Sequence, residues 1–305
     1  MLSQFLPGRA LRVVALALCA GMGLTTLAHA QETYTLRYKF SPEEIVRWQV
    51  VQQAKVRTTM AANMQTAQTD SRSVKIWKIK EVKENGDVVF VHSVEKVVMR
   101  QSLTGRADVV YDSESSDPPP AGFEQAAANV GIPLSQITMS ATGEVVERKD
   151  LKEQYRPGGE SPMSIPLSKD PIKVGAGWSQ PQTITVKLKS GLEKQIACKQ
   201  QFFLKGVKGG IAEIQVSTVV LEPVKDPAIE AQLVQQATKG IIRFNIAAGR
   251  VIEQEMDISE RVVGAFGPAS SFEFEMKFHE QLLDERGESV AQGPVNGPLP
   301  PPKNK

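Results

Sequence analysis

The segment 46–60 reads VRWQVVQQAKVRTTM and alternates between two kinds of side chain. Even-numbered positions such as Val46, Trp48 and Val56 are mostly apolar, whereas most odd-numbered positions are charged or carry an amide. Because successive side chains of a β-strand point to opposite faces, this pattern predicts one long strand with a buried face and a wet face. The preceding residues 41–44, SPEE, are typical of a helix start. Alternation over the whole segment outweighs that signal.

Similar alternation predicts further strands, which are 74–82, 88–94, 184–189, 196–204 and 271–279. Residues 84–87, ENGD, connect the first two. Asn-Gly favours a type I′ hairpin turn, in which both central residues need positive φ. The predicted fold class is mainly β, with antiparallel twisted sheets or a half-barrel and one or two short helices.

The chain also repeats a series of features, which indicates an ancient duplication. Residues 77–83, WKIKEVK, resemble residues 202–208, FFLKGVK, and each run is followed by a glycine turn and an apolar strand. A short helical candidate and a hairpin then follow, at 123–129 and 143–147 in the first copy and at 228–238 and 249–253 in the second. Two strand-hairpin-helix-hairpin units are therefore predicted, with Trp48 and Trp178 as candidate equivalents.

These features divide the chain into four parts. Residues 1–30 are predicted to be a signal peptide, 31–160 the first β-rich repeat, 161–283 the second repeat, and 284–305 a disordered tail rich in proline and glycine. The two repeats are expected to form one continuous body, with residues 155–162 as the seam between them.

The leader carries two charges, Arg9 and Arg12, ahead of the apolar run 13–20. Residues 28–30, Ala-His-Ala, supply the small side chains that a signal peptidase reads, which places cleavage between Ala30 and Gln31. The apolar run is shorter than the ~20 residues that a membrane-spanning helix needs, and no later stretch reaches that length. The sequence therefore predicts an exported protein, periplasmic or extracellular, without a transmembrane segment.

Charge and cysteine content narrow the functional classes. The chain has 36 Lys+Arg and 34 Asp+Glu, and loss of Arg9 and Arg12 with the leader leaves equal numbers. Balanced, interspersed charges lack the basic patch that binds phosphates, so nucleic acid is not an expected partner. Cys198 is then the single remaining cysteine, and its place on the apolar face of a predicted strand indicates a buried thiol.

The sequence contains no catalytic or metal-binding motif that rises above the background. His92 and His279 both lie in alternating strands, and two isolated histidines are weak evidence for a metal site. The acidic residues Asp112, Glu114 and Asp117 lack the glycine and the final glutamate of a known calcium loop, which favours a solvated loop. No catalytic residue, metal site or cofactor is predicted.

Glu253, Glu255 and Asp257 have the spacing of one strand face. Paired carboxylates serve glycoside hydrolysis when a second carboxylate lies across a cleft, which leaves a hydrolase using surface carboxylates as one hypothesis. With Arg243 and Arg250 nearby to balance the charge, a wet strand face is the preferred interpretation.

The large aromatic side chains lie at apolar strand positions, where core packing is the default interpretation. The alternative is a concave apolar face, because a curved antiparallel sheet can enclose a cavity for a lipid or another apolar ligand. In that case Trp48, Trp77 and Phe202 are the candidate ligand-binding residues.

Several segments resemble an uncharacterised family of exported bacterial β-rich proteins, known only as a domain of unknown function: 40–51, 76–93, 226–233, 249–251 and 260–264. The resemblance covers residues 34–283 and implies no activity, cofactor or binding residue. The long hairpins are also similar in architecture to the LolA-type periplasmic carriers of lipoproteins, an analogy of fold that does not establish function.

The sequence thus favours an exported, non-enzymatic protein of the bacterial cell envelope with a binding or structural role, whose partner is an envelope protein or an apolar ligand. The first alternative is a periplasmic carrier of a lipid or other apolar ligand, and the second is the hydrolase. A cavity of several hundred Å³ with apolar walls would favour the carrier, because ligand sites have about that size, and a filled interior would favour a scaffold.

Overall fold

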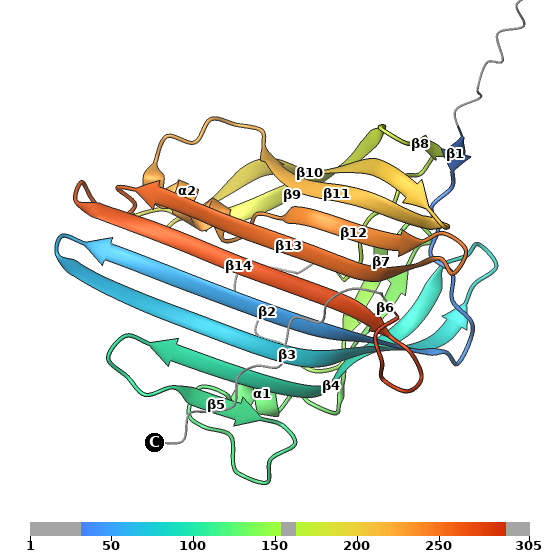
Figure 1. Ribbon diagram of the computed structural model, residues 1–305, viewed down its shortest axis with the longest axis horizontal. Coiled ribbons are helices and arrows are strands. Elements are labelled where there is room, and N and C mark those ends of the chain that lie inside the picture. The colour runs from blue at the N-terminus through green and yellow to red at the C-terminus, as the bar shows by residue number, and fades with distance from the viewer. Residues whose placement is uncertain (1–31, 154–162, 291–305) are drawn as a thin grey trace, which may run out of the picture. The chain divides into compact units, whose positions relative to one another are not determined.

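The computed structural model describes residues 32–153 and 163–290, and this part of the chain is mainly β (Figure 1). The predicted signal peptide with Ala30 and Gln31, the whole of the predicted seam and residues 291–305 of the predicted tail lie outside the described residues. Within the described ranges, no helix is long and apolar enough to cross a membrane.

The strands are β1 (Thr33–Tyr34), β2 (Ile45–Met60), β3 (Asn63–Val82), β4 (Val88–Leu103), β5 (Val109–Asp112), β6 (Pro133–Met139), β7 (Val145–Asp150), β8 (Ile172–Lys173), β9 (Gly177–Lys187), β10 (Glu193–Lys208), β11 (Ile211–Val220), β12 (Lys239–Asn245), β13 (Arg250–Val263) and β14 (Ser270–Leu283). The two helices assigned in the described ranges are α1 (Glu124–Ala127) and α2 (Pro227–Val234).

A twelve-stranded sheet forms the body, with the order β7-β6-β4-β3-β2-β14-β13-β12-β11-β10-β9 and with β5 paired to β4. All of its ladders are antiparallel, and β1 and β8 form a separate two-stranded sheet. The last strand, β14, lies beside the first long strand, β2, so the two ends of the fold meet in the middle of the sheet (Figure 1). Strands β7 and β9 do not pair with each other in the described ranges, so the sheet is open rather than a closed barrel.

The long-strand predictions are confirmed, and β2 and β14 span the segments that alternate most clearly. Residues 41–44 form a single turn, in which the Ser41 amide donates to the Glu44 carboxylate, and Glu43 has a positive φ of 64° that ends any helix.

The prediction of a type I′ turn at Asn85-Gly86 is wrong. Gly86 alone in that loop has positive φ, because the Asn85 side chain instead accepts a hydrogen bond from the Asp87 amide.

An aromatic cluster packs at the centre of the main core. Tyr38, in the segment before β2, contacts the ring of Phe244 on β12 at 5.6 Å and that of Phe40 at 6.2 Å. Phe40 in turn lies 6.0 Å from Trp77, and Trp77 lies 4.7 Å from Trp48. Strands β3 and β12 are not neighbours in the sheet, so this cluster joins two distant parts of one curved sheet.

The segment that carries Tyr38 passes between two glycine turns. The Tyr38 amide donates to the Ala141 carbonyl beside the β6–β7 turn, and the Lys39 amide donates to the carbonyl of Gly249 in the β12–β13 turn. A Cβ on Gly143 would lie 2.5 Å from the Ile165 carbonyl oxygen and 2.7 Å from the Tyr38 ring. The absence of a side chain at these turns therefore lets the segment pack closely.

Small satellite cores lie beside the main one. Cys198 on β10 is buried with Leu233 of α2, which confirms the prediction of a buried thiol, and burial raises the pKa of that thiol.

The chain continues past β14 into a turn in which the Asp284 amide donates to the Glu288 carbonyl.

The close approach at Gly143 predicts that Gly143→Ala destabilises the protein more than Gly105→Ala. Both glycines have positive φ, 85° and 76°, so both variants carry the ~1–2 kcal/mol cost of a left-handed alanine. Only at Gly143 does the new methyl group meet other atoms, which adds a further loss of about 1–3 kcal/mol. Urea unfolding of both variants measures the difference, and equal losses would contradict the packing described.

Candidate functional site

A cavity of about 690 Å³ lies on the inner face of the sheet, beside the aromatic cluster. Trp48 on β2, Trp77 on β3 and Phe202 on β10 all border it. Five strands separate β3 from β10 in the sheet order, so the curvature of the sheet brings these side chains to one site. All three residues are at most 3% exposed, which means that most of each ring packs in the core and only a small part forms cavity wall. Their role in binding a ligand stays a prediction.

The rest of the wall combines apolar and polar side chains. Val216, Met256 and Phe278 contribute apolar surface, while Gln52, Ser73, Gln200, Gln254 and Thr238 contribute amides and hydroxyls. The amide and hydroxyl side chains cannot pack as part of an apolar core, because a buried polar group needs hydrogen-bond partners. The mixed lining suits a molecule with both apolar and polar parts.

An ion pair lies in the cavity wall. The Lys75 ammonium on β3 is 2.9 and 2.8 Å from the two carboxylate oxygens of Glu280 on β14. The same ammonium lies 4.9 Å from the ring centre of Trp48 and 5.4 Å from that of Trp77. The side chains of Lys75 and Glu280 are only 17% and 7% exposed.

Sequence reasoning missed this pair, although a signal was present. Glu280 continues the series Phe272, Phe274, Met276 and Phe278, and so occupies the next inward position of an apolar strand face. Lys75 likewise precedes two buried residues of the same face, Trp77 and Ile79. A charge at an inward position of an alternating strand is the pattern that could have identified both residues.

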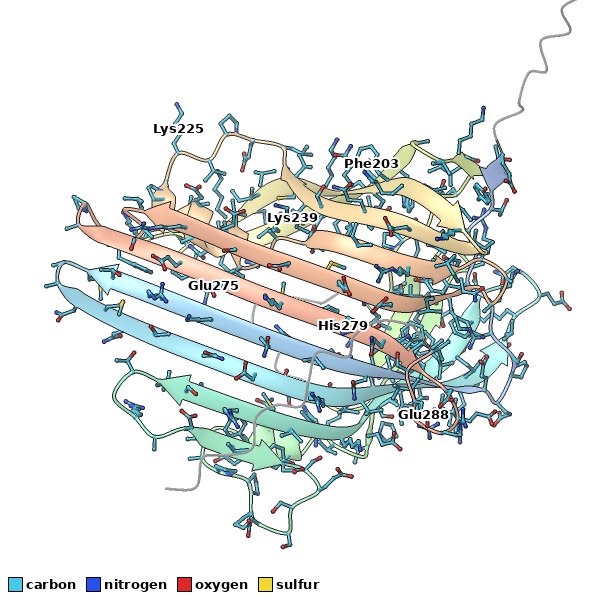
Figure 2. All side chains as sticks on the ribbon, viewed as in Figure 1. Phe203, Lys225, Lys239, Glu275, His279 and Glu288 are labelled. Atoms are coloured by element: carbon cyan, nitrogen blue, oxygen red, sulfur yellow. The ribbon has the colours of Figure 1, made fainter. Side chains whose placement is uncertain are left out.

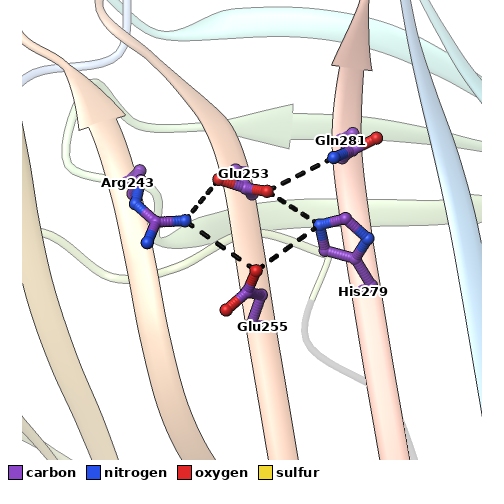
Figure 3. A network of polar contacts seen from close by, with 5 residues as sticks. All are labelled: Arg243, Glu253, Glu255, His279 and Gln281. Atoms are coloured by element: carbon purple, nitrogen blue, oxygen red, sulfur yellow. Dashed lines mark hydrogen bonds and ion pairs between the residues drawn. The ribbon is translucent and has the colours of Figure 1, made fainter. Parts of the chain in front are cut away.

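A second polar site lies on the opposite face of the sheet. Figure 3 shows Glu253 on β13 with three partners: Arg243 on β12, and His279 and Gln281 on β14. His279 Nε2 lies 2.8 Å from Glu253 Oε1, and Gln281 donates to the same oxygen at 3.3 Å. His279 shares its face of β14 with Glu275 (Figure 2), whereas Gln254 and Glu280, the residues that alternate with this network, line the cavity.

The prediction that Glu253 lies on a wet strand face is wrong, because its side chain is only 4% exposed. Burial by itself raises the pKa of a carboxyl group. Hydrogen bonds from His279, Gln281 and Arg243, together with the Arg243 charge, outweigh that effect and hold the pKa of Glu253 below its ordinary value. Glu255 and Asp257 are exposed, as predicted.

Glu253, Glu255 and His279 are also the one group of potential metal ligands found in the described residues, with ligand atoms within 4.8 Å of one another. The Arg243 guanidinium, however, is bonded to Glu253 and lies 3.9 Å from Glu255. That cation already neutralises charge on both carboxylates, as a metal ion would. The geometry is therefore that of an internally satisfied ionic network.

The other sequence candidates are not brought together. His92 borders the cavity while His279 belongs to the network on the opposite face, so the two histidines do not form a pair. Asp112 and Asp117 accept hydrogen bonds within their own loop, and Glu114 lies 3.7 Å from Lys96. These contacts are those of a solvated acidic turn.

Comparisons with known proteins do not identify a family. No family model and no curated protein matches the chain, so the resemblance to an uncharacterised exported family stays a prediction. A solved structure titled "Lipid-protein interactions in lipovitellin" is similar over 84% of this chain, with 12% sequence identity and a TM-score of 0.45. The match spans 27% of the lipovitellin chain, and a TM-score of this size does not establish a common fold.

The depressed pKa of Glu253 predicts a specific dependence of stability on pH. A carboxyl group whose pKa is lower in the folded than in the unfolded state stabilises the fold above its unfolded pKa of about 4.3, and this contribution is lost as the pH falls through the folded pKa. Glu253→Gln lacks that contribution. The gap in unfolding free energy between the wild-type protein and Glu253→Gln should thus be wide near pH 7 and should narrow as the pH falls below the unfolded pKa of about 4.3.

Urea unfolding at a series of pH values measures this gap. Glu275→Gln is the control, because Glu275 is exposed on the neighbouring strand β14, and this variant should show little pH-dependent difference from the wild-type protein. A gap for Glu253→Gln that stays constant from neutral to acid pH would contradict the assignment.

Proposed function

We propose that this protein is a non-enzymatic binding protein that holds an apolar or amphiphilic small molecule in the cavity bordered by Trp48, Trp77 and Phe202. The cavity is the observation that carries the proposal, since its volume of about 690 Å³ falls within the ~300–1,000 Å³ of small-molecule sites. A sheet-rich scaffold would have no need for such a space. Of the functions considered from the sequence, the carrier of an apolar ligand agrees best with it.

The carboxylates do not support a hydrolase. Glu253 lies on the face of the sheet opposite the cavity, and its oxygens are already bonded to Arg243, His279 and Gln281. Catalysis by paired carboxylates requires one acid and one base across a substrate-binding cleft. The network is therefore assigned a structural role in this proposal.

The proposal includes export. A carrier of an apolar ligand is of use in the aqueous space of a cell envelope or outside the cell, and the first 30 residues have the pattern of a signal peptide. Intact-mass measurement of the protein from expressing cells should give the chain that begins at Gln31. Recovery of only the uncleaved chain would contradict this part of the proposal.

A duplication would explain how the curved sheet arose. Strands β2-β3-β4-β6-β7 and β9-β10-β11-β12-β13 follow the same neighbour order, with α1 and α2 before the fourth strand of each set. Trp48 contacts Trp77 at 4.7 Å, and the proposed equivalents Trp178 and Phe202 contact each other at 5.3 Å. These matching contacts support the proposal that each half descends from one strand-hairpin-helix-hairpin unit.

Filling the cavity tests the binding function. Gln254→Trp places a large ring in the cavity, whereas Asp257→Trp places the same ring on the exposed face of the same strand. With the neutral dye N-phenyl-1-naphthylamine as probe, Gln254→Trp should bind at least about tenfold more weakly than the wild-type protein, and Asp257→Trp should bind like it. Dye emission during titration gives the dissociation constants.

Two results would refute the binding function. One is a wild-type protein that does not take up the dye. The other is equally tight binding by Gln254→Trp and Asp257→Trp, because the dye would then lie somewhere other than in the cavity.

A further inference from the structure

The ion pair in the cavity wall is unusual because charges are costly to bury. Removing two ions from water often costs as much as their attraction returns, so an ion pair in such a place is weak evidence of a stabilising role. Lys75 and Glu280 nevertheless face each other across β2, in the wall of a cavity whose other side chains, apart from His92, are apolar or neutral polar. A role in recognising a ligand accounts for their position better than a role in stability.

Both charged groups retain hydrogen-bonding capacity. An ammonium has three N–H donors, and Lys75 donates to the two oxygens of Glu280. A carboxylate has about four acceptor sites, so Glu280 can accept further bonds. In addition, the indole Nε1 of Trp77, a buried donor beside the ammonium, has no hydrogen-bond partner in the described structure.

The surroundings favour a head group with both signs of charge. A ligand with only a negative group could approach Lys75 but would be repelled by Glu280, whose oxygens lie within 2.9 Å of the ammonium. A ligand with only a positive group would meet the same difficulty at Lys75. A zwitterion places one charge against each partner, and the Trp48 and Trp77 rings beside the site also attract a cation through their faces.

We infer that the cavity selects an amphiphile with a zwitterionic head group, whose negative group binds Lys75 and whose positive group binds Glu280 beside Trp48. The apolar chain then lies along Met256, Phe278 and Val216. This inference rests on the proposed function, because it names the class of ligand that the same cavity takes.

Three surfactants with the same twelve-carbon chain test the inference by calorimetric titration below their micelle concentrations. Dodecylphosphocholine carries a zwitterionic head, dodecyl phosphate a negative head and dodecyltrimethylammonium a positive head. The wild-type protein should bind dodecylphosphocholine at least about tenfold more tightly than either of the others. Equal or weaker binding of dodecylphosphocholine overturns the inference.

A double variant, Lys75→Met/Glu280→Met, removes both charges at similar volume and leaves no buried charge unpaired. It should lose the preference for dodecylphosphocholine, and the readout is the ratio of its dissociation constants for the three surfactants, so that a change in overall affinity does not affect the result. A preference that survives in this variant overturns the inference. If the variant does not fold, Lys75→Gln/Glu280→Gln takes its place, and the ranking of the three surfactants on the wild-type protein decides by itself.

Binding of the dye distinguishes a failure of the proposed binding function from a failure of the inference about the head group. A wild-type protein that binds the dye but ranks the three head groups equally retains the proposed function and loses the inference. A wild-type protein that binds neither dye nor surfactant loses both.

Discussion

The contact of Tyr38 with Phe244 on one side and, through Phe40, with Trp77 on the other is the interaction on which the rest of the structure depends. An open sheet of this width can bury one face only if distant strands fold towards each other or another layer covers them. Here the extended segment around Tyr38 fills the space between β3 and β12. The close packing of Tyr38 on Gly143 and the hydrogen bond from the Lys39 amide to the Gly249 carbonyl hold that segment in place.

The cavity lies where the packing of the aromatic cluster ends. Beside the aromatic cluster, the inward side chains of the central strands change from large apolar rings to Gln52, Ser73 and Gln254, which cannot complete a dry core. These side chains do not fill the space between the strands, and the cavity of about 690 Å³ remains. The ion pair of Lys75 and Glu280 lies in the wall of this space, and in our proposal it adds a charge-based choice among ligands to the mixed apolar and polar lining.

The sequence predicted what is local and missed what depends on pairing. The alternation of residues 46–60 and 271–279 is a property of single strands, so β2 and β14 could be recognised. That these two strands are neighbours could not, because more than 200 residues separate them in the chain. Glu253 was expected in water for the same reason: its burial depends on Arg243 and His279, which reach it only through the ladders on either side of β13. Lys75 and Glu280 were predictable as inward charges, but not as partners.

Native mass spectrometry of the protein, purified gently from the cells that make it, tests the central claim most directly. The account predicts a population one ligand heavier than the bare chain, with an added mass of a few hundred daltons, about that of a molecule that fits a site of this size. The extra mass should be absent from the variant Gln254→Trp, in which a large ring blocks the cavity. Protein that is consistently free of any bound molecule, in preparations that retain its fold, would contradict the account.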